Sequence, residues 1–585
     1  MNIYLVSNSE KLSKLPFNQI SVEDSLSMLR DMNPIGLDTE TSGLSHIDND
    51  LLCIQFGNKE KQIVVDTTTV DIQLYKDLLE DENKLFLLWN AKFDLKFFFK
   101  HSIVLKKVWD GFLGEKLLHM GFPKGSYSAS LQAAANKYLN LYMDKSIRGN
   151  IIYMGLTKDV IEYAAKDVEF LEDIKDKQDI LIKREGISRA LDLENTAVIP
   201  IAYMEFCGVK LDKEKWLKKV KETETEFEKT ITDLDNWLIE NNPEYTRLTI
   251  KGDLFDGFDT VRTSKINWKS SKQLGAFLES IGMNLTYKDP KDGKIKIKTD
   301  KNSIKKYEKT HSIVPFLLEF TKLQKQLSTY GYNVLEMVNP KTGRIYTNFN
   351  QLGTDTGRLS SGGSDTINMQ NLPSDALTRS CFIAEEGNAW LSADYSGQES
   401  YLMASMANDE AMIHELTYGD KDIHSLVAKL CFPKEIGDTP ISEIKHKFHS
   451  LRQKAKGPEF CFAYGGNDKT LVSQYGMEAE EAYNIYTNYM SGFKGLCKYQ
   501  EDARANVVKN GYIIINELTG HKVFIHNHKH VLDLKNKQDK EYWDRYRKAK
   551  EEAKEGEKIP IIEEVKYVFK QISNWGKHAI NYPMK

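Results

Sequence analysis

The sequence has little net charge and no paired cysteines. Its 80 basic residues are balanced by 84 acidic ones, which gives a net charge of −4. This balance argues against a histone-like global attraction to nucleic acid, although it permits local basic grooves. The six cysteines form no Cys-x-x-Cys pair, so we expect neither a structural zinc site nor a disulfide framework. Such cysteine usage fits a reducing cytoplasm.

Long apolar runs are also missing. The first twenty residues mix serine, lysine and asparagine with apolar residues, so they predict no signal peptide. No segment reaches the length of a membrane span, and we expect no contact with a membrane. The length of 585 residues instead predicts a protein of about two to four domains.

Acidic residues recur at the ends of predicted elements in the first third of the chain. Asp38 and Glu40 follow an apolar strand; because residues i and i+2 of a strand face the same side, the two carboxylates should point together. Such a pair is costly without a nearby cation. Asp94 follows a second buried-strand run at 85–89. Taken alone, an Asp-x-Glu pair is more often a solvated strand end.

A third segment completes this set. Tyr163 and Asp167 are one turn apart in a helix predicted from about residue 157 to 182, so they share one face. Together the four carboxylates could form an all-oxygen site for two Mg²⁺ or Mn²⁺ ions. Two such ions can activate a water for phosphodiester hydrolysis, and Tyr163 would orient that water.

A ribbon of cations and rings lies late in the chain. Arg452, Lys456, Phe460 and Tyr464 follow one another at four-residue spacing, so on a helix they form one stripe. Charge at one end and rings at the other match a nucleoside triphosphate, whose phosphates suit Arg and Lys and whose base suits aromatic rings. The alternative is an ordinary amphipathic helix with a basic edge.

The three acidic segments resemble the motifs of the DnaQ-like, ribonuclease H-like 3′→5′ exonucleases, with a Tyr-x-x-x-Asp third motif. Trp109-Asp110 also matches that family's middle region. The resemblance implies a mixed central sheet flanked by helices. It also implies that Asp38, Glu40, Asp94 and Asp167 are metal ligands. These four residues and Tyr163 would be the catalytic residues of the exonuclease.

The remaining sequence resembles family A DNA polymerases, the bacterial polymerase I type. The resemblance rests on the start of the polymerase part at 194–212, thumb-like segments at 266–278 and 319–330, and Asp394-Tyr395-Ser396-Gly397-Gln398-Glu399, which matches motif A. The helical ribbon matches motif B. Without a large 5′-nuclease domain, the chain is similar to phage replicative enzymes. A short hairpin is also predicted at 289–298.

This resemblance implies an α/β multidomain fold: a ribonuclease H-like exonuclease domain followed by a polymerase right hand of thumb, incomplete palm and fingers. The expected segments are an exonuclease domain at 1–190, the start of the polymerase part and the thumb at 191–338, the first part of the palm with motif A at 339–405, and the fingers with motif B at 406–585. A charged insertion at about 529–565 is expected to be solvated, with contact to a processivity or replisome protein as the alternative.

The resemblance also implies roles in nucleotide and DNA binding. Asp394, at the end of an apolar strand predicted at 389–393, would ligate both catalytic metals, and the Tyr395 carbonyl would ligate one. Glu399 would exclude a 2′-hydroxyl. Arg452 and Lys456 would hold the triphosphate of a dNTP, Phe460 would pack on sugar and base, and Tyr464 would gate the template slot. Contact with primer-template DNA is assigned to Arg358, Gln370 and Asn371.

One family feature is not found. After motif B we see no His-Asp-Glu turn, the motif C that carries a second acidic residue for two-metal transfer. We therefore expect an incomplete polymerase whose remaining palm comes from a second polypeptide, or is separated by an intron, an intein, a recoded stop codon or a cloning boundary. By itself the chain should extend primers little.

Three hypotheses follow. The first is a proofreading family A DNA polymerase that acts in DNA replication in the cytoplasm, of a host cell if the gene belongs to a phage. The second is a stand-alone 3′→5′ exonuclease. The third is a non-catalytic subunit that binds DNA and nucleotides and supports a partner carrying motif C.

Overall fold

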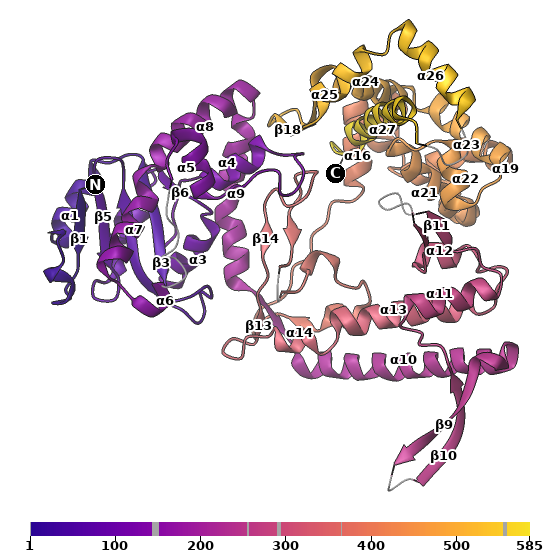
Figure 1. Cartoon of the computed structure of the whole chain (residues 1–585), viewed down its shortest axis with the longest axis horizontal. Helices are drawn as coiled ribbons and strands as arrows, with labels where there is room; N and C mark the ends of the chain where they lie inside the picture. The colour runs from indigo at the N-terminus through magenta and orange to yellow at the C-terminus, as the bar shows by residue number, and fades with distance from the viewer. Residues whose placement is uncertain are drawn as a thin grey trace. The chain divides into compact units, whose positions relative to one another are not determined.

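The structure is a computed structural model that describes residues 2–142, 151–253, 257–288, 294–363, 366–553 and 558–584. The chain packs as two units, traced in Figure 1. Unit 1 comprises Met1–Phe206, Phe349–Ser360 and Ser392–Lys585, and unit 2 comprises Cys207–Asn348 and Ser361–Leu391. None of the helices in these described ranges is both long and apolar enough to cross a membrane.

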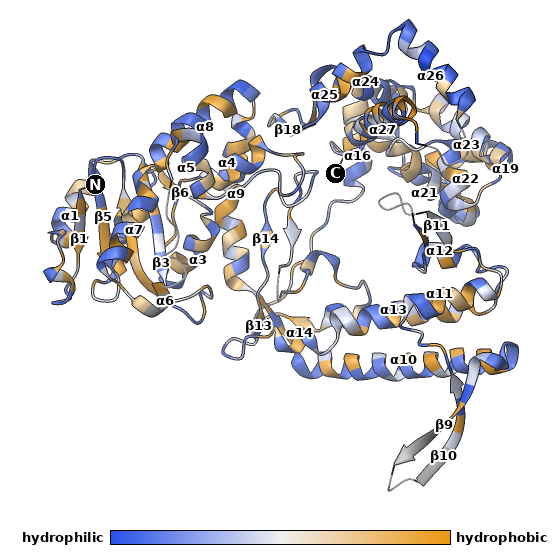
Figure 2. Cartoon of the chain, viewed as in Figure 1, coloured by the Kyte–Doolittle hydropathy of each residue, from blue (hydrophilic) through white to orange (hydrophobic). Residues whose placement is uncertain are grey.

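Unit 1 begins with a mixed seven-stranded sheet. Its strand order is β2 (Asn18–Gln19), β1 (Ile3–Val6), β5 (Gln62–Asp66), β4 (Leu51–Gly57), β3 (Ile35–Thr41), β6 (Phe86–Leu88) and β7 (Val108–Asp110). The β3–β4 and β4–β5 pairs are antiparallel, and the other pairs are parallel. Strand β5 is buried along its whole length, and Figure 2 shows the middle of the sheet in the hydrophobic colour. The mixed sheet agrees with the expected exonuclease fold.

Helices lie between the strands of this sheet in the sequence and follow its last strand. They are α1 (Val22–Arg30), α2 (Lys76–Leu79), α3 (Lys92–Lys100), α4 (Gly111–Leu118), α5 (Leu131–Leu139), α6 (Ile151–Met154), α7 (Lys158–Glu169), α8 (Leu171–Glu185) and α9 (Ser188–Cys207). The single helix predicted from 157 to 182 is therefore wrong in detail. Phe170, with φ −111° and ψ 6°, leaves helical geometry and separates α7 from α8.

Helix α7 lies directly against β3 and β4. Its buried Val160, Ala164 and Val168 recur every four residues and form one apolar stripe. The close approach requires Gly36 in β3, because a Cβ there would lie only 2.7 Å from the carbonyl oxygens of Gly57 and Val168. This packing brings the polar face of α7 next to the end of β3.

The C-terminal part of unit 1 is mainly helical. Its elements are α16 (Gln398–Ala407), α17 (Glu410–Tyr418), α18 (Ile423–Cys431), α19 (Pro433–Ile436), α20 (Ile441–Lys447), α21 (His449–Ala463), α22 (Asp468–Tyr475), α23 (Ala479–Gly492), α24 (Lys494–Asn510), β17 (Tyr512–Asn516), β18 (His521–Phe524), α25 (His528–Asn536), α26 (Lys540–Glu552) and α27 (Pro560–Asn581). The predicted charged insertion corresponds to α25, α26 and the start of α27. Its Tyr542 is buried and donates to Glu564 at 2.9 Å.

The two ends of unit 1 share one hydrophobic core. Val523 and Trp575 belong to the same buried cluster as residues of the N-terminal sheet. The β17–β18 hairpin also makes polar contacts with the N-terminal part: the Phe524 N–H donates to the Met120 carbonyl at 2.8 Å, and His521 lies 3.3 Å from Glu194. The N-terminal sheet and the C-terminal helices therefore form one unit although all of unit 2 lies between them in sequence.

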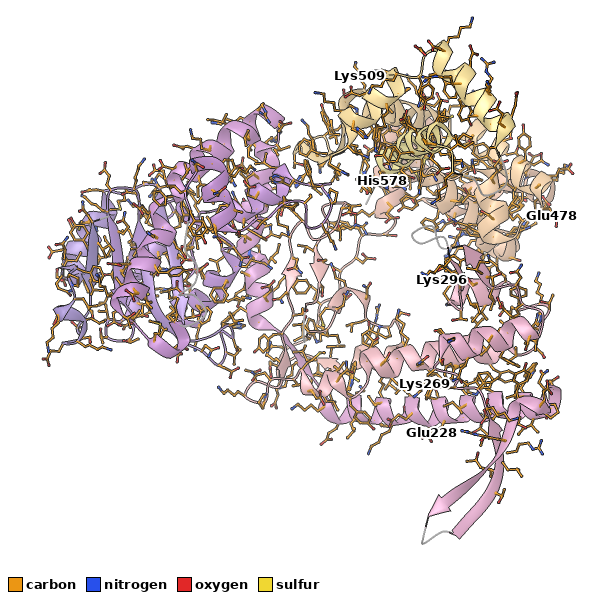
Figure 3. The ribbon with its side chains drawn as sticks, in the orientation of Figure 1. Glu228, Lys269, Lys296, Glu478, Lys509 and His578 are labelled. Atoms are coloured by element: carbon orange, nitrogen blue, oxygen red, sulfur yellow. The ribbon has the colours of Figure 1, made fainter. Side chains whose placement is uncertain are left out.

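Unit 2 is built on a pair of long helices. Its elements are β8 (Val209–Leu211), α10 (Lys213–Asn241), β9 (Thr246–Asp253), β10 (Gly257–Ser264), α11 (Ser271–Ser280), β11 (Thr286–Lys288), β12 (Ile295–Ile297), α12 (Lys301–Lys305), α13 (Val314–Tyr330), α14 (Asn333–Glu336), β13 (Arg344–Ile345), α15 (Ala376–Ser380) and β16 (Phe382–Ile383). Strand β14 (Phe349–Asn350) belongs to unit 1, and β15 (Ser360–Ser361) stands where the sequence passes from unit 1 to unit 2. Helices α10 and α13 pack together through Phe227 and Phe320, whose rings stack at 5.1 Å. Lys269, labelled in Figure 3, covers the Phe227 ring at 5.4 Å. Strands β11 and β12 pair as the predicted hairpin, and residues 289–293 of that prediction lie outside the described residues.

The strand predicted at 389–393 is wrong. These residues form no strand, and Trp390 and Leu391 are 62% and 91% exposed. An apolar run becomes a buried strand only when a neighbouring strand pairs with it. No described strand pairs with this segment, so its apolar side chains remain in solvent.

Candidate active sites

Three carboxylates converge in the N-terminal part of unit 1. Asp38 and Glu40 come from β3, and Asp167 comes from α7. One oxygen of each lies within 4.8 Å of the others. The sequence predicted this convergence from strand alternation and helical spacing, and the close packing of α7 on β3 produces it.

A buried glutamine holds the first carboxylate. Gln55 in β4 has no exposed surface, and its amide donates to Asp38 at 2.7 Å. The sequence analysis missed Gln55, although a glutamine inside the apolar strand Leu51–Gly57 was an available signal. Buried polar side chains almost always have a specific partner.

Asp94 lies close to this cluster but is held differently. It sits in the first turn of α3, is 2% exposed, and accepts a hydrogen bond from the Thr39 hydroxyl at 2.5 Å. Burial raises its pKa to about 7, although the Thr39 hydrogen bond acts in the opposite direction. Of the four carboxylates that the sequence predicted to converge, three therefore do so, and Asp94 lines the same cavity without joining that close group.

Tyr163 completes this cavity. It is one turn before Asp167 on α7 and is hydrogen-bonded to it. Burial, together with the nearby charges of Asp167 and Glu40, raises the pKa of its hydroxyl well above the usual range, so the phenol stays protonated and can donate or accept. The cavity has a volume of about 770 Å³ and contains all five predicted exonuclease residues.

The donor set suits a hard divalent cation. All the converging atoms are carboxylate oxygens, the ligands preferred by Mg²⁺ and Mn²⁺. Three mutually close carboxylates would repel one another without such a cation. Among the described residues, the group of three or more His, Cys, Asp or Glu side chains close enough together to hold one metal ion is that of Asp38, Glu40 and Asp167.

Asp110 fixes the backbone that carries Asp94. Its buried carboxylate accepts the N–H groups of Asn90 and Ala91 at 2.8 and 2.9 Å, just before α3 begins. Asn90 adopts a left-handed conformation with φ 66°, which the hydrogen bond helps to maintain. Burial raises the pKa of Asp110 to about 6, against the effect of these N–H donors.

Glu205 of α9 anchors the same helix from outside. Its carboxylate, 2% exposed, lies 2.5 Å from Lys92 and 3.0 Å from Lys96, both on α3. It also accepts the Phe349 N–H at 2.7 Å, while Lys92 donates to the Phe349 carbonyl at 2.6 Å. The three side chains thus attach the start of the Phe349–Ser360 segment to the helix that carries Asp94.

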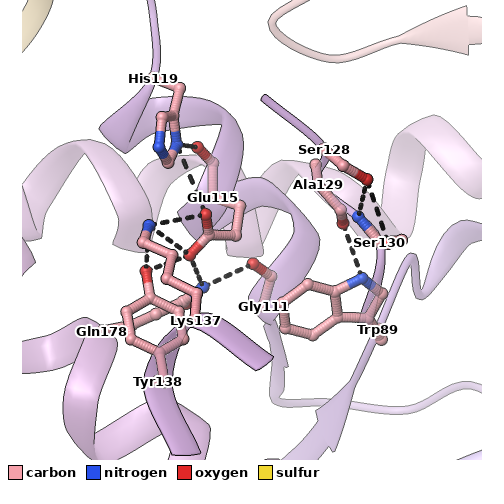
Figure 4. A network of polar contacts seen from close by, with 10 residues as sticks. All are labelled: Trp89, Gly111, Glu115, His119, Ser128, Ala129, Ser130, Lys137, Tyr138 and Gln178. Atoms are coloured by element: carbon pink, nitrogen blue, oxygen red, sulfur yellow. Dashed lines mark hydrogen bonds and ion pairs between the residues drawn. The ribbon is translucent and has the colours of Figure 1, made fainter. Parts of the chain in front are cut away.

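A second polar network joins the helices beside the cavity. Figure 4 shows Glu115 of α4 accepting from Gln178 of α8 at 3.0 Å and from Lys137 of α5 at 3.1 Å. Tyr138 also donates to Glu115, and Trp89 donates to the Ala129 carbonyl at 2.9 Å. These contacts are structural, because Glu115 is 1% exposed and fully engaged.

A groove of about 440 Å³ borders the carboxylate cavity and shares Phe112 and Ala129 with it. Lys116, His119 and Lys124 supply cationic or titratable groups to its lining, and His119 stacks on Tyr127 at 4.5 Å. Cations combined with flat rings are the usual lining of single-strand nucleic-acid sites.

The predicted ribbon lies on α21. Arg452, Lys456 and Phe460 belong to this helix, and Tyr464 is its C-terminal cap. Arg452 places a guanidinium fork on Asp422, at 2.9 and 3.0 Å. Burial opposes ionisation of Asp422, but the hydrogen bonds from Arg452 and Ser425 hold its pKa below the usual value. Phe460 is 44% exposed.

Motif A and motif B residues meet at Glu399. Tyr464 donates to Glu399 at 2.6 Å, and Arg358 approaches its other oxygen at 3.5 Å. Burial, followed by the bond to Glu399, raises the pKa of Tyr464. Asp394 and Tyr395 are exposed. The structure therefore brings Arg358, Glu399 and Tyr464 together, whereas Asp394 belongs to no group of three or more closely spaced metal-binding side chains among the described residues.

Glu459 of α21 is a buried carboxylate with a specific partner. It is 2% exposed and accepts a hydrogen bond from His424 of α18. The His424 ring lies 6.3 Å from the Phe460 ring. The pair links α18 to α21 beside the ribbon.

The other predicted DNA contacts lie in unit 2. Gln370 and Asn371 are exposed, and Asn371 lines a cavity of about 1010 Å³ along α12 and α13. Its lining includes four lysines: Lys301, Lys305, Lys322 and Lys325. The excess of cations suits a polyanion.

Comparison with protein families decides the relationship. A model described as DNA polymerase family A matches residues 256–549, just over half of the chain, and one described as 3′-5′ exonuclease matches residues 15–179. This chain belongs to DNA polymerase family A. The resemblance seen in the sequence is thereby confirmed, as is the predicted multidomain α/β fold class.

Relatives of this family A chain include bacterial DNA polymerases I. That of Aquifex aeolicus is 26% identical over 513 residues, which cover 83% of this chain and 79% of the relative. That of Caldicellulosiruptor bescii is 28% identical over 372 residues, which cover 60% of this chain. The family A chain spans only 39% of the length of the C. bescii relative.

A solved structure shows the same fold. The POL domain of Pol1 from M. smegmatis, in complex with DNA primer-template and dNTP, superimposes with a TM-score of 0.70 at 22% identity. The match covers 99% of this family A chain and 86% of the other chain. The likeness concerns the fold.

Proposed function

We propose that this chain removes nucleotides from 3′ ends of DNA and, in its complete form, carries out template-directed DNA synthesis with that activity as proofreading. The observation that carries the first part is the cluster of Asp38, Glu40 and Asp167 beside Asp94 and Tyr163. Family membership supports the second part.

In the exonuclease reaction, Asp38, Glu40 and Asp167 would hold divalent ions, Mg²⁺ or Mn²⁺, with Asp94 as the fourth carboxylate. When bound, two such ions supply an activated water and stabilise the leaving oxygen. Tyr163, protonated because of its raised pKa, would orient the attacking water. Gln55 keeps Asp38 in a fixed rotamer for metal binding.

The bordering groove supports a single-stranded substrate. A frayed 3′ end needs cations for its phosphates and rings for its unpaired bases. The groove beside the carboxylates offers Lys116, Lys124 and the His119–Tyr127 stack. Duplex DNA would lie along the lysine-lined cavity of unit 2 and contact Asn371 there. Gln370 and Arg358 would also contact DNA.

For synthesis, Arg452 and Lys456 would hold the dNTP phosphates and Phe460 would pack on its sugar and base. Glu399 would exclude a 2′-hydroxyl, Tyr464 would gate the template slot, and Asp394 with the Tyr395 carbonyl would ligate two metal ions. Arg452 already donates to both oxygens of Asp422. A bound triphosphate would therefore share Arg452 with the Asp422 carboxylate or displace that carboxylate.

The exposure of Asp394 favours a polymerase that depends on a second polypeptide or segment for activity. Two-metal transfer needs a further carboxylate, and Asp394 is not part of any group of three or more metal-binding side chains among the described residues. We propose that a second polypeptide or segment carrying motif C supplies it, and that activity takes place in the cytoplasm, of the host if a phage encodes the chain. The same observation favours the second candidate, a stand-alone exonuclease.

A paired assay tests these roles. With Mg²⁺ the purified chain should degrade a labelled single strand from its 3′ end, and Asp38→Ala should remove this activity. The control is Asp31→Ala, which changes an exposed aspartate at the C-terminal end of α1 and should keep the activity. Full degradation by Asp38→Ala would reject the metal-ligand assignment. Primer extension should be negligible until a motif C polypeptide is added, and robust extension by the pure chain would reject that dependence.

A further inference from the structure

Another cavity of unit 1 lies beside β7, and none of the clustered carboxylates lines it. It has a volume of about 450 Å³ and is formed by the loop before β7, by α8 and by α9. We call it the lysine cleft, because Lys106, Lys107, Lys175 and Lys183 line it. Its size is within the range of small-molecule sites.

The lysine cleft has an apolar wall opposite its charges. Val108 and Trp109 of β7, Ile182 of α8 and Leu191 of α9 contribute buried side chains to it. The indole nitrogen of Trp109 is buried and has no hydrogen-bond acceptor among the described residues. Such a wall suits a flat ring, which would pack on the apolar side chains that line the cleft.

The charge of the cleft favours a dianion. Its lining holds four lysines and two aspartates, Asp179 and Asp192, so two positive charges are in excess. Lys175 is paired with Asp179 at 2.6 Å, while Lys107 and Lys183 make no ion pair with any described residue. A phosphate monoester carries about −1.5 to −2 charges at pH 7, which matches this excess.

The cleft is also connected to the carboxylate cavity. Asn195 of α9 lines the cleft, and its side-chain oxygen accepts the Asp110 N–H at 3.0 Å. Asp110 in turn holds the N–H groups of Asn90 and Ala91, at the start of the helix that carries Asp94. A ligand that moves Asn195 would therefore act on the backbone next to Asp94.

We propose that the lysine cleft binds a deoxynucleoside monophosphate, the product that the exonuclease would release, and that its occupation slows the exonuclease. The phosphate lies between Lys107 and Lys183, and the base lies against the wall of Val108, Ile182 and Leu191. This inference rests on the proposed exonuclease function for its biological meaning, but the binding itself does not depend on catalysis.

Binding is measured on the full chain in EDTA, which removes metal-dependent product binding at the carboxylates. Equilibrium dialysis with labelled dAMP should show saturable binding, weakened at least tenfold in the Lys107→Ala/Lys183→Ala variant. Lys177→Ala, an exposed lysine of α8 outside the cleft, should change binding less than twofold. Inorganic phosphate, which lacks the base, and dATP, which carries excess charge, should both compete more weakly than dAMP.

The effect of dAMP on the exonuclease rate tests the cleft separately from the proposed exonuclease function on which its role rests. Added dAMP should lower the maximal exonuclease rate of the wild-type chain, and the double lysine variant should retain full basal activity but lose this effect. Absence of dAMP binding up to about 10 mM, or equal binding by the double variant, would overturn the inference while leaving the exonuclease intact. A chain without exonuclease activity that still binds dAMP through the two lysines would instead refute the proposed function.

Discussion

The contacts of Glu205 allow a quantitative prediction about the stability of unit 1. The carboxylate is 2% exposed and engages Lys92, Lys96 and the Phe349 N–H. Removal of one partner from a buried ion pair costs about 3–5 kcal/mol, because a charge is left unpaired in a poorly solvated place. Lys92 and Lys96 keep 15% and 16% of their side-chain surface, so we expect the lower end, about 3 kcal/mol, for Glu205→Gln.

This loss is large enough to measure by thermal denaturation. Unfolding entropy is about 2.1 cal/mol/K per residue, so for a unit as large as unit 1 a loss of 3 kcal/mol lowers Tm by about 3–4 °C. A double-mutant cycle with Lys96→Met should give a coupling free energy of about 1–3 kcal/mol between the two side chains. Glu60→Gln, an exposed glutamate in the loop between β4 and β5, is the matched control.

Two results would refute this reasoning. The first is a Tm for Glu205→Gln within about 1 °C of both wild type and Glu60→Gln. The second is strict additivity of Glu205→Gln and Lys96→Met, because contact at 3.0 Å in a buried network should not be additive. Hydrogen exchange of the Phe349 amide gives a local check, since that N–H should exchange faster in the variant.

Three further predictions concern the two sites. Gln55→Leu, which removes the donor to Asp38, should raise the Mg²⁺ requirement or lower the exonuclease rate by about 10–100-fold; an unchanged Mg²⁺ titration would contradict this. Without metal, the pKa of about 7 for Asp94 lies above the unfolded value of about 3.9, so its contribution to stability is present below pH 4 and is lost as pH rises through 7. In EDTA, the loss of stability between pH 4 and 7 should therefore be smaller for Asp94→Asn than for the wild type. Equal slopes of Tm against pH for the two proteins over this range would contradict the prediction. Glu399→Ala, which removes one partner of Arg358 and one of Tyr464, should increase ribonucleotide incorporation in the enzyme supplemented with motif C; unchanged discrimination would exclude a gating role.

The carboxylate site was predictable because its geometry is mostly local. Asp38 and Glu40 share a strand face, and Tyr163 and Asp167 share a helix face, so two short-range rules placed four of the five residues. The hydrogen bond from Thr39 to Asp94 was not predictable, because it depends on how α3 packs beside β3. Gln55 was missed for the same reason: its partner is 17 residues away on a neighbouring strand.

The polymerase part shows where pattern rules stop. The four-residue spacing correctly predicted one ribbon on α21, but the fork between Arg452 and Asp422 depends on the packing of α18 against α21. The strand at 389–393 failed because apolar composition says nothing about the presence of a pairing partner. The roles of the ribbon residues and the domain boundaries stay predictions.

The order in which unit 1 is assembled along the chain has a consequence for its biogenesis. A ribosome completes the N-terminal sheet first, then makes all of residues 207–348, and only afterwards makes the β17–β18 hairpin and α27 that share its core. Until then Met120 and Glu194 lack their later partners, Phe524 and His521. The nascent N-terminal part therefore exposes this surface throughout most of translation, and slow synthesis of the middle of the chain would prolong the exposure of its apolar residues.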